Sequence, residues 1–303
     1  MRRDPGRPAQ RSCERGPLRS AMTTRGGSGP HESALADVLT GMGTVSTSRR
    51  SGRSRMAGVP TTLPASTRST GRQLALGIEE AAAPAGRREV LPGAVHVPGW
   101  LDLDVQCRLV DEFRRWALPP AGLRHPRVPT GHLMSVQSVC LGWHWYPYVY
   151  SKTADDTDGA PVKPLPDELA EMARAAVGAA YDSTDPAARS YAPDAAIVNL
   201  YSPGARLGLH QDGEEPSAAP VVTISLGDTC TFRLADVDRR TGPFTDVELR
   251  SGDLLVFGGP TRRIYHGVPK VFEDTSPEDL GLPPGRLSIT VRETGLTPRV
   301  NPG

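Results

Sequence analysis

Two segments of the chain repeat apolar residues at the spacing of an α-helix. In residues 100–116 (WLDLDVQCRLVDEFRRW) the apolar positions recur every three or four residues, so one face of a helix would be apolar. Asp102 or Asp104 can cap the start of this helix. Residues 166–180 (PDELAEMARAAVGAA) show a similar pattern. We therefore expect two helices ahead of residue 195.

From residue 195 onward the pattern changes to short apolar strands separated by turns. The expected strands read AAIVNLY, VVTISLG, CTFRLAD, DVELRSG, DLLVFGG, RRIYHGV and GRLSITVRE. Residues 91–97 (LPGAVHV) and the alternating, aromatic residues 133–150 predict further strands. Short strands at this spacing are typical of an antiparallel sandwich or barrel. The predicted fold is therefore α+β and mainly β, with a double-stranded β-helix (jelly roll) core and supporting N-terminal helices.

Composition separates the first part of the chain from the rest. Residues 1–88 hold few large apolar residues and much Arg, Gly, Ser and Pro, whereas the sequence from residue 89 has the composition of a globular domain. A segment that cannot bury enough apolar surface does not fold. We therefore expect residues 1–88 to be a disordered N-terminal extension and residues 89–303 to form one domain.

Charge divides the chain at the same place, although the net charge of the whole is only +1. Residues 1–90 carry 15 arginines and 7 acidic residues, a net charge of +8, and the remainder carries 20 basic and 27 acidic residues, a net charge of −7. The bland interpretation is a solvated leader, and the alternative is weak binding of nucleic acid by counterion release. A third alternative is a translation start at Met22, Met42 or Met56.

Several classes of protein do not fit the sequence. No apolar run approaches the roughly 20 residues of a membrane-spanning helix. The arginines at the N-terminus are not followed by the apolar segment of a secretory signal. The four cysteines are far apart and include no C-x-x-C pair, which argues against a zinc ribbon. We expect a monomeric, cytoplasmic protein that does not associate with membranes.

Three residues form a candidate metal site. His210 and Asp212 follow a predicted strand and a Pro-Gly turn, and in a strand positions i and i+2 face the same side. His266 lies in another predicted strand, 54 residues beyond Asp212. Two histidines and one carboxylate leave open positions on an iron(II) ion, as oxygenases need. Taken alone, His266 is better explained as a packed core histidine than as a metal ligand.

Two arginines strengthen the case for this site. Arg286 and Arg292 lie six residues apart in one predicted strand and therefore face the same side. A guanidinium grips a carboxylate with two hydrogen bonds, so an acidic co-substrate is the natural partner. The alternative for either arginine is a surface salt bridge.

The order of these motifs resembles the AlkB family of Fe(II)- and 2-oxoglutarate-dependent dioxygenases, over roughly residues 90–295. The resemblance is densest in residues 194–216 (DAAIVNLYSPGARLGLHQDGEEP), and further matches are LGW, YVYS, PVVTISLG, SGDLLVFGG and RRIYHGV. It implies an enzyme that uses Fe(II), 2-oxoglutarate and O2 to remove N-alkyl groups, of the 1-methyladenine and 3-methylcytosine type, from DNA, with RNA as the alternative nucleic acid. Residues 89–192 would form the nucleotide-recognition lid and helices, and residues 193–296 the jelly-roll catalytic core.

The resemblance also implies the roles of the iron and co-substrate residues. His210, Asp212 and His266 would bind the iron. The co-substrate 2-oxoglutarate would be held by residues of two neighbouring strands, namely Asn199, Tyr201, Arg286, Ser288 and Arg292. Arg286 would pair with one carboxylate, and Arg292 would bind the other end of the molecule.

A further set would bind the nucleic acid. The resemblance implies that Trp143 stacks on a flipped base, with His266 on the opposite side, and that Tyr148 contacts the backbone or the base pocket. Glu214 occupies the position where the family places an acid that meets the exocyclic amine of the base. Five more residues would line the nucleotide cleft, namely Met134, His132, Arg206, Gln211 and Arg239.

The sequence departs from the family pattern at three positions. Ser288 replaces an Asn between the two arginines, Val291 replaces an aromatic residue before the second arginine, and His132 replaces a Tyr in the lid. The first change bears on co-substrate affinity, and the last bears on substrate preference. Because residues 91–303 are acidic overall, nucleic acid would need a local basic groove, for which the candidates are Arg124, Arg127, Lys152, Arg206, Arg239 and Arg240.

Three other functions remain as alternatives. The same dioxygenase chemistry could act on a protein or a small molecule. The chain could be a nucleic-acid-binding module with a decayed site, although the complete ligand set argues against decay. A cupin-like metal protein of another class would carry a His-rich metal motif, which the sequence lacks.

Overall fold

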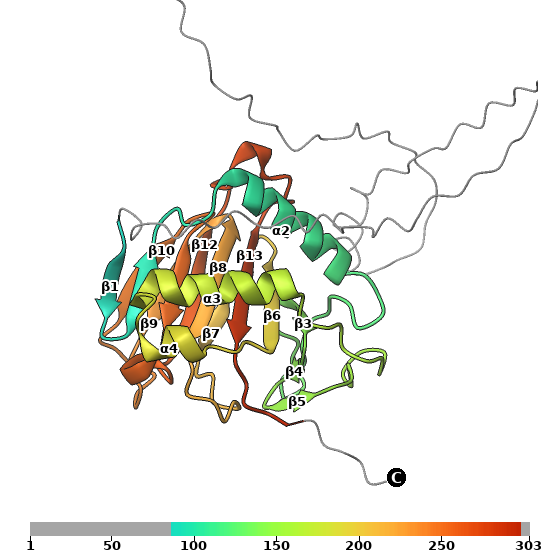
Figure 1. Cartoon of the computed structure of the whole chain (residues 1–303). Coiled ribbons are helices and arrows are strands. Elements are labelled where there is room, and N and C mark those ends of the chain that lie inside the picture. Colours follow the sequence, from blue (N-terminus) through green and yellow to red (C-terminus); the bar gives the residue numbers. More distant parts are fainter. Residues whose placement is uncertain (1–85, 298–303) are drawn as a thin grey trace, which may run out of the picture.

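The described chain, residues 86–297 of the computed structural model, is built on two antiparallel β-sheets (Figure 1). The larger sheet has seven strands, in the order β1 (Arg88–Leu91), β2 (Ala94–Val97), β11 (Leu254–Phe257), β8 (Val221–Gly227), β13 (Arg286–Arg292), β6 (Ala195–Tyr201) and β3 (Gln137–Leu141). The smaller sheet has four, in the order β10 (Thr245–Leu249), β9 (Thr229–Leu234), β12 (His266–Phe272) and β7 (Leu207–His210).

Short elements complete the described part of the chain. The strands β4 (His144–Tyr146) and β5 (Val149–Ser151) pair as a separate hairpin. The helices are α2 (Leu103–Trp116), α3 (Asp167–Tyr181), α4 (Pro186–Ser190), η1 (Gly259–Thr261) and η2 (Glu278–Leu280). The fold is thus mainly β with few helices. Among residues 86–297, no helix is both long enough and apolar enough to cross a membrane.

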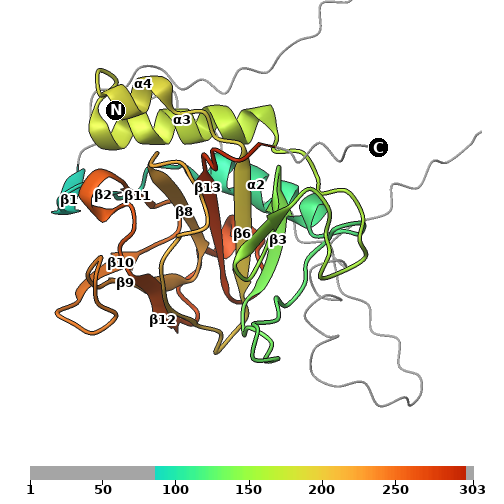
Figure 2. The same ribbon diagram turned by 90° about the horizontal axis from the view of Figure 1, so that it is seen from below.

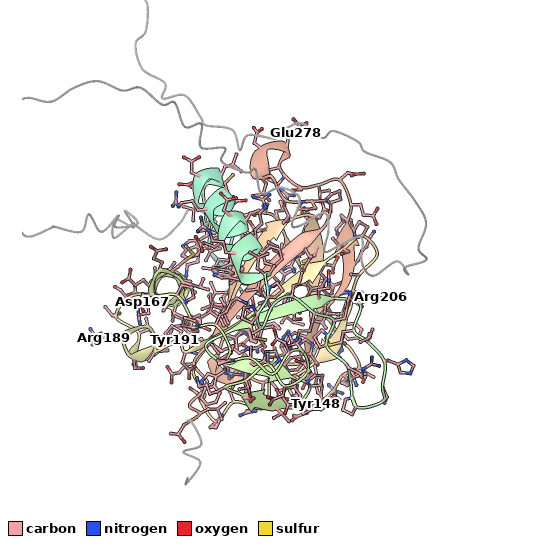
Figure 3. All side chains as sticks on the ribbon, turned by 90° about the vertical axis from the view of Figure 1, so that its right-hand side faces the viewer. Tyr148, Asp167, Arg189, Tyr191, Arg206 and Glu278 are labelled. Carbon is pink, nitrogen blue, oxygen red and sulfur yellow. The ribbon has the colours of Figure 1, made fainter. Side chains whose placement is uncertain are left out.

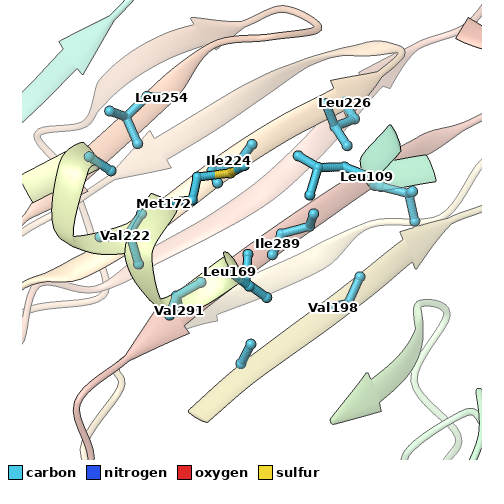
Figure 4. Close-up of a cluster of buried hydrophobic side chains, with 14 of the residues drawn as sticks. Leu109, Leu169, Met172, Val198, Val222, Ile224, Leu226, Leu254, Ile289 and Val291 are labelled. Carbon is cyan, nitrogen blue, oxygen red and sulfur yellow. The ribbon is translucent and has the colours of Figure 1, made fainter. Parts of the chain in front are cut away.

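The larger sheet has an apolar outer face that packs under the long helices. Leu287, Ile289 and Val291 of β13 belong to the same buried cluster as Leu109 of α2 and Leu169 of α3 (Figure 4). The helix α3 lies across one side of this sheet, and β9, β10 and β12 lie on the other (Figures 1 and 2). Alternation along β13 therefore points its even-numbered residues inward, toward the smaller sheet.

The inner face of the sheet is polar near β13 and apolar beside it. Phe257 of β11 and Tyr201 of β6 pack with Phe232 of the smaller sheet in a second buried cluster. On the same side, β13 presents Arg286 and Arg292, both buried. A buried polar face in the middle of an apolar one is costly unless it binds something.

Both expected helices are present. The side chain of Asp102, one of the two candidate caps, accepts a hydrogen bond from Val105 N at 2.8 Å and so begins α2. The helix α3 begins after Pro166 and ends at Tyr181. The short helix α4 was not predicted, because five residues are too few to show a helical period.

Most strands lie where the pattern predicts them, with three differences. The segment 91–97 is the second half of a hairpin, because Gly93 turns the chain between β1 and β2 with a φ of +79°. A Cβ at Gly93 would lie 2.4 Å from Gly258 O, so this turn requires glycine. The segment 133–150 divides into three separate strands, β3, β4 and β5.

The third difference concerns the metal-site motifs. The strand β7 ends at His210, so Asp212 lies beyond the strand rather than on its face, as we expected. Similarly, β12 begins only at His266, and residues 262–265 precede it. Three of the seven strands in the larger sheet precede residue 193. The predicted extension lies almost entirely outside the described residues.

Candidate active site

The smaller sheet brings the three predicted metal ligands together. His266 in β12 is paired directly with His210 in β7, and Asp212 follows two residues later. One ligand atom from each side chain lies within 4.8 Å of the others. The Nε2 atoms of His210 and His266 are 3.7 and 3.9 Å from the carboxylate oxygens of Asp212. The spacing suits a single metal ion between them.

Hydrogen bonds fix the orientation of both imidazoles. Nδ1 of His210 lies 3.0 Å from Gly208 O, and Nδ1 of His266 lies 3.0 Å from Ile264 O. A carbonyl oxygen only accepts, so each Nδ1 must carry the proton. When such a ring binds a metal, the lone pair available to it is on Nε2, the atom that faces Asp212.

The charges of the cluster suit a divalent cation. Burial alone would raise the pKa of Asp212, but the positive charge of Arg292, with His266 and His210, holds it well below its usual range. Burial and the neighbouring His210 lower the pKa of His266 to about 4, despite the Asp212 carboxylate. At neutral pH the cluster presents a carboxylate and a neutral imidazole, the forms that bind metal.

A closed ring of buried charges holds Asp212 in place. Nη2 of Arg292 donates to Oδ2 of Asp212 at 2.7 Å, and Nη1 donates to the Tyr150 hydroxyl at 3.1 Å. The hydroxyl of Tyr150 donates to Oε1 of Glu215 at 2.5 Å. Nη2 of Arg262 donates to Oε2 of Glu215 at 3.2 Å, and Nη1 of Arg262 donates to the backbone oxygen of Asp212 at 3.0 Å, which closes the ring. Two carboxylates and two guanidiniums thus balance inside the protein.

Sequence reasoning missed three members of this ring, namely Tyr150, Glu215 and Arg262. All three stand in motifs that carried the resemblance, YVYS, GEEP and RRIYHGV. Their roles depend on burial, which the motifs do not encode. Arg292, which the resemblance assigned to 2-oxoglutarate, has Asp212 as its nearest charged partner.

Arg286 differs from the other buried arginines. Its side chain is fully buried, and none of its three guanidinium nitrogens has a hydrogen-bond partner within residues 86–297. The guanidinium lies 5.1 Å from the ring of Tyr201, which pairs with it across β6 and β13. The Tyr201 hydroxyl and the Cys230 thiol are its polar neighbours, and the remaining N–H groups are costly in a protein interior unless an acceptor such as a carboxylate meets them. The donor set therefore fits 2-oxoglutarate.

The neighbours of Arg286 on the inner face of the sheet are also polar. Ser288 is buried opposite Asn199 of β6 and Ser225 of β8, and the hydroxyl of Ser225 has no hydrogen-bond partner among the described residues. Asn199 accepts a hydrogen bond at 2.6 Å from Ser138 of β3. Ser288 and Ser225 thus place two buried hydroxyls side by side on this face.

Trp143 precedes the β4–β5 hairpin and is only 6% exposed. Its Nε1 donates to Asp194 at 3.0 Å, and the Lys152 ammonium lies 3.6 Å from the centre of its ring. The ring is therefore tethered at its edge and covered on one face. Tyr148, at the turn of the hairpin, is 68% exposed and reaches the surface (Figure 3).

The other predicted substrate residues lie at different depths in the protein. Gln211 is half-buried and donates to Val237 O and Arg263 O, and Glu214 is half-buried beside Glu215. Met134 is half-buried, and the remaining three are exposed, namely His132, Arg206 (Figure 3) and Arg239. Of the candidates for a basic groove, Arg124 does not qualify, because it is buried against Asp156.

The sequence of this site matches a known class of enzyme. Residues 93–292 match the family model of the 2OG-Fe(II) oxygenase superfamily. Enzymes of this class use Fe(II), 2-oxoglutarate and O2. His210, Asp212 and His266 could hold the iron, and Arg286 fits the co-substrate.

Individual relatives narrow the class. The chain is 36% identical to an alpha-ketoglutarate-dependent dioxygenase AlkB homolog from Caulobacter vibrioides over 211 residues, 67% of this chain and 88% of that one. It is 35% identical to the DNA N(6)-methyladenine demethylase ALKBH1D of Arabidopsis thaliana, over 67% of this chain and 50% of that one. The solved structure of OsALKBH1 matches with a TM-score of 0.61 and 32% identity, over 68% of this chain and all of that one.

The chain therefore belongs to the AlkB family of Fe(II)- and 2-oxoglutarate-dependent dioxygenases. It spans about half the length of the Arabidopsis relatives that it matches.

Proposed function

We propose that this protein is an oxidative demethylase that removes N-alkyl groups from nucleobases of DNA, with RNA as a second substrate. The observation that carries the proposal is the His210–Asp212–His266 cluster, which lies between the same two sheets as the buried, unmatched guanidinium of Arg286. A metal site beside an anion site is what a 2-oxoglutarate-dependent oxidation requires.

In this proposal each group of residues has a separate task. His210, Asp212 and His266 hold the iron, and Arg286 holds a carboxylate of 2-oxoglutarate, assisted by Tyr201. The bound iron supplies the oxidation of the N-alkyl carbon at the expense of 2-oxoglutarate and O2, with release of formaldehyde, succinate and CO2. Arg292 keeps the Asp212 carboxylate ionised and oriented, since it donates to Oδ2 at 2.7 Å.

Asn199 and Ser288 add polar groups to the co-substrate pocket, and Arg292 borders it. Ser288 has a shorter side chain than the Asn of the family pattern, so it reaches less far toward 2-oxoglutarate. The two facing sheets support a double-stranded β-helix as the catalytic core, over residues 193–296, with α2 and α3 as the supporting helices.

Residues 89–192 would then recognise the nucleotide. A base must leave the helix stack to reach a buried metal, and a base whose pairing is already weakened leaves at the lowest cost. Trp143 would receive the base, Glu214 would meet its exocyclic amine, and the exposed Tyr148 would contact the backbone. The cleft would be lined by Met134, His132, Arg206, Gln211 and Arg239.

The relatives support nucleic acid as the substrate class. The names of those relatives include DNA N(6)-methyladenine demethylase in Arabidopsis thaliana and tRNA demethylase in Schizosaccharomyces pombe. We propose methylated adenine and cytosine in DNA as substrates here, and a monomeric, cytoplasmic enzyme.

The test uses the full chain with Fe(II), 2-oxoglutarate and oligonucleotides that contain 1-methyladenine, 3-methylcytosine or N6-methyladenine. We expect loss of the mass of one CH2 group from an oligonucleotide, together with formaldehyde and succinate, and no loss with His210→Ala. Succinate without demethylation of any oligonucleotide would favour a protein or small-molecule substrate. Absence of both products in the wild type would refute the proposal.

A further inference from the structure

A lysine ammonium lies over the ring of Trp143. The ammonium of Lys152 lies 3.6 Å from the ring centre and also donates to Gly142 O at 2.7 Å. The second bond anchors the ammonium, because Gly142 belongs to the backbone that leads into Trp143. The cation is thus part of the surroundings of this ring rather than a passing surface charge.

The ring itself has little freedom to move away from the cation. Trp143 Nε1 donates to Oδ2 of Asp194 at 3.0 Å, and the same carboxylate accepts from the Thr294 hydroxyl. A Cβ at Gly142, whose φ is +76°, would lie 1.9 Å from Asp194 O, so the backbone of this segment is also fixed. Lys152, in contrast, is an exposed residue on a long stem.

We propose that Lys152 determines the charge preference of the base site, so that the site disfavours positively charged methylated bases relative to neutral ones. The inference rests on the proposed function, in which Trp143 receives the base. Methylation of adenine at N1 or of cytosine at N3 leaves a positive charge on the ring, whereas methylation at the exocyclic N6 leaves the base neutral. The class favoured by Lys152 is therefore the neutral, exocyclically methylated purine.

The sign of the effect does not depend on which face of Trp143 takes the base. If the base stacks on the face opposite Lys152, it lies roughly 7 Å from the ammonium, across the indole ring. If it takes the covered face, the flexible stem leaves the ammonium beside it. In both cases a positive base meets a like charge, and a neutral base does not. The Lys152 ammonium also occupies one negative face of the indole, so that face cannot attract a cationic base.

The size of the effect follows from Coulomb's law. At roughly 7 Å, the repulsion between two unit charges weakens binding by a factor of about three if the dielectric constant is that of water. At the effective dielectric constant of a protein surface, the same repulsion weakens binding by a factor of about fifty. We expect about tenfold. Asp194 and Glu214 attract a cationic base, but they are the same in a Lys152 variant, so the change in preference reports Lys152 alone.

The test compares two oligonucleotides of identical sequence, one with 1-methyladenine and one with N6-methyladenine. Their dissociation constants and kcat/KM values are measured for the full-length wild type and for Lys152→Gln, with binding measured without O2 so that no turnover occurs. Gln keeps a donor for Gly142 O but removes the charge. We expect Lys152→Gln to raise binding and kcat/KM of the charged base about tenfold relative to the neutral one.

Two control variants isolate the charge on the ring. Lys152→Arg should restore the wild-type preference. Lys270→Gln removes a lysine that lies 4.3 Å from the ring of Phe272, and it should leave the preference unchanged. Loss of a phosphate contact would weaken both oligonucleotides equally and cancel in the ratio.

A ratio that stays within twofold in Lys152→Gln, while both methylated oligonucleotides are bound and turned over, overturns the role of Lys152 alone. Failure of the wild type to bind and turn over any methylated oligonucleotide in preference to the unmodified one overturns the proposed function, and this inference with it.

Discussion

Replacing Arg286 by Met should stabilise the protein while removing its co-substrate. The guanidinium is fully buried, and all three of its nitrogens are without hydrogen-bond partners among the described residues. Each unmatched buried polar group costs about 1–3 kcal/mol. Attraction between the guanidinium and the Tyr201 ring, at 5.1 Å, offsets about 1 kcal/mol of this destabilisation. Met keeps much of the length without the charge, so we expect the free energy of unfolding to rise by at least about 2 kcal/mol without ligand.

The assay is denaturation with and without 2-oxoglutarate. A ligand present at about 100 times its Kd stabilises the wild type by about 2.7 kcal/mol. Each kcal/mol shifts Tm by about 2–4 °C in a domain of this size. We therefore expect 2-oxoglutarate to raise the Tm of the wild type and to leave that of Arg286→Met unchanged.

The matched control is Arg262→Met. This variant removes one of the two arginines that neutralise the buried Glu215, and it should cost about 3–5 kcal/mol because it leaves the buried ring with one excess negative charge. If Arg286→Met destabilises the protein as much as this control does, Arg286 has a structural partner and does not hold the co-substrate.

Three further predictions concern the surroundings of the site. Glu215→Gln leaves the ring of buried charges around Asp212 with one excess positive charge. We expect a 10- to 100-fold loss of metal affinity, measured by Co(II) titration. Unchanged affinity would contradict the role of the ring. His144 is buried, which would lower its pKa, but the hydrogen bond to Asp156 raises the pKa above 6.5; the pair therefore stabilises the fold fully below pH 6.5 and loses its effect as pH rises through the folded pKa. Denaturation of His144→Gln should show a larger loss at pH 6 than at pH 9, and an equal loss would contradict this. Gly142→Ala places a Cβ 1.9 Å from a backbone oxygen at a φ of +76°; we expect a loss of at least about 2 kcal/mol by urea denaturation, and a wild-type midpoint would contradict this.

Regular periodicity explains which parts of the fold were predictable. The outward positions of β13 are Leu287, Ile289 and Val291, and alternation alone sends Arg286 and Arg292 to the opposite face. That face is buried in the structure, as the candidate site required. Segments without a period, such as the end of β7 after His210, could not be predicted, because their course is set by contacts with distant residues.

Neighbouring residues of the same chemistry could not be distinguished from sequence. Glu214 and Glu215 are adjacent, yet Glu215 is 1% exposed and joins two arginines, whereas Glu214 is half-buried. The register that selects Glu215 follows from the path of residues 211–217 over the sheet, which has no periodic pattern. Lys152 was predicted only as one member of a basic groove, because the sequence does not show whether the folded chain places a cation over an aromatic ring.

The two arginines of β13 show most clearly what the structure adds. In the sequence they are equivalent, six residues apart on one face, and either could hold 2-oxoglutarate. In the structure Arg292 has Asp212 at 2.7 Å and Tyr150 at 3.1 Å, so two of its guanidinium nitrogens are already bonded. Arg286 has no such partner in the part of the chain that the structure describes. A buried cation is costly unless something compensates it, so we expect an anion bound in the site to meet Arg286 first, and Arg292 to act on the metal site by holding Asp212.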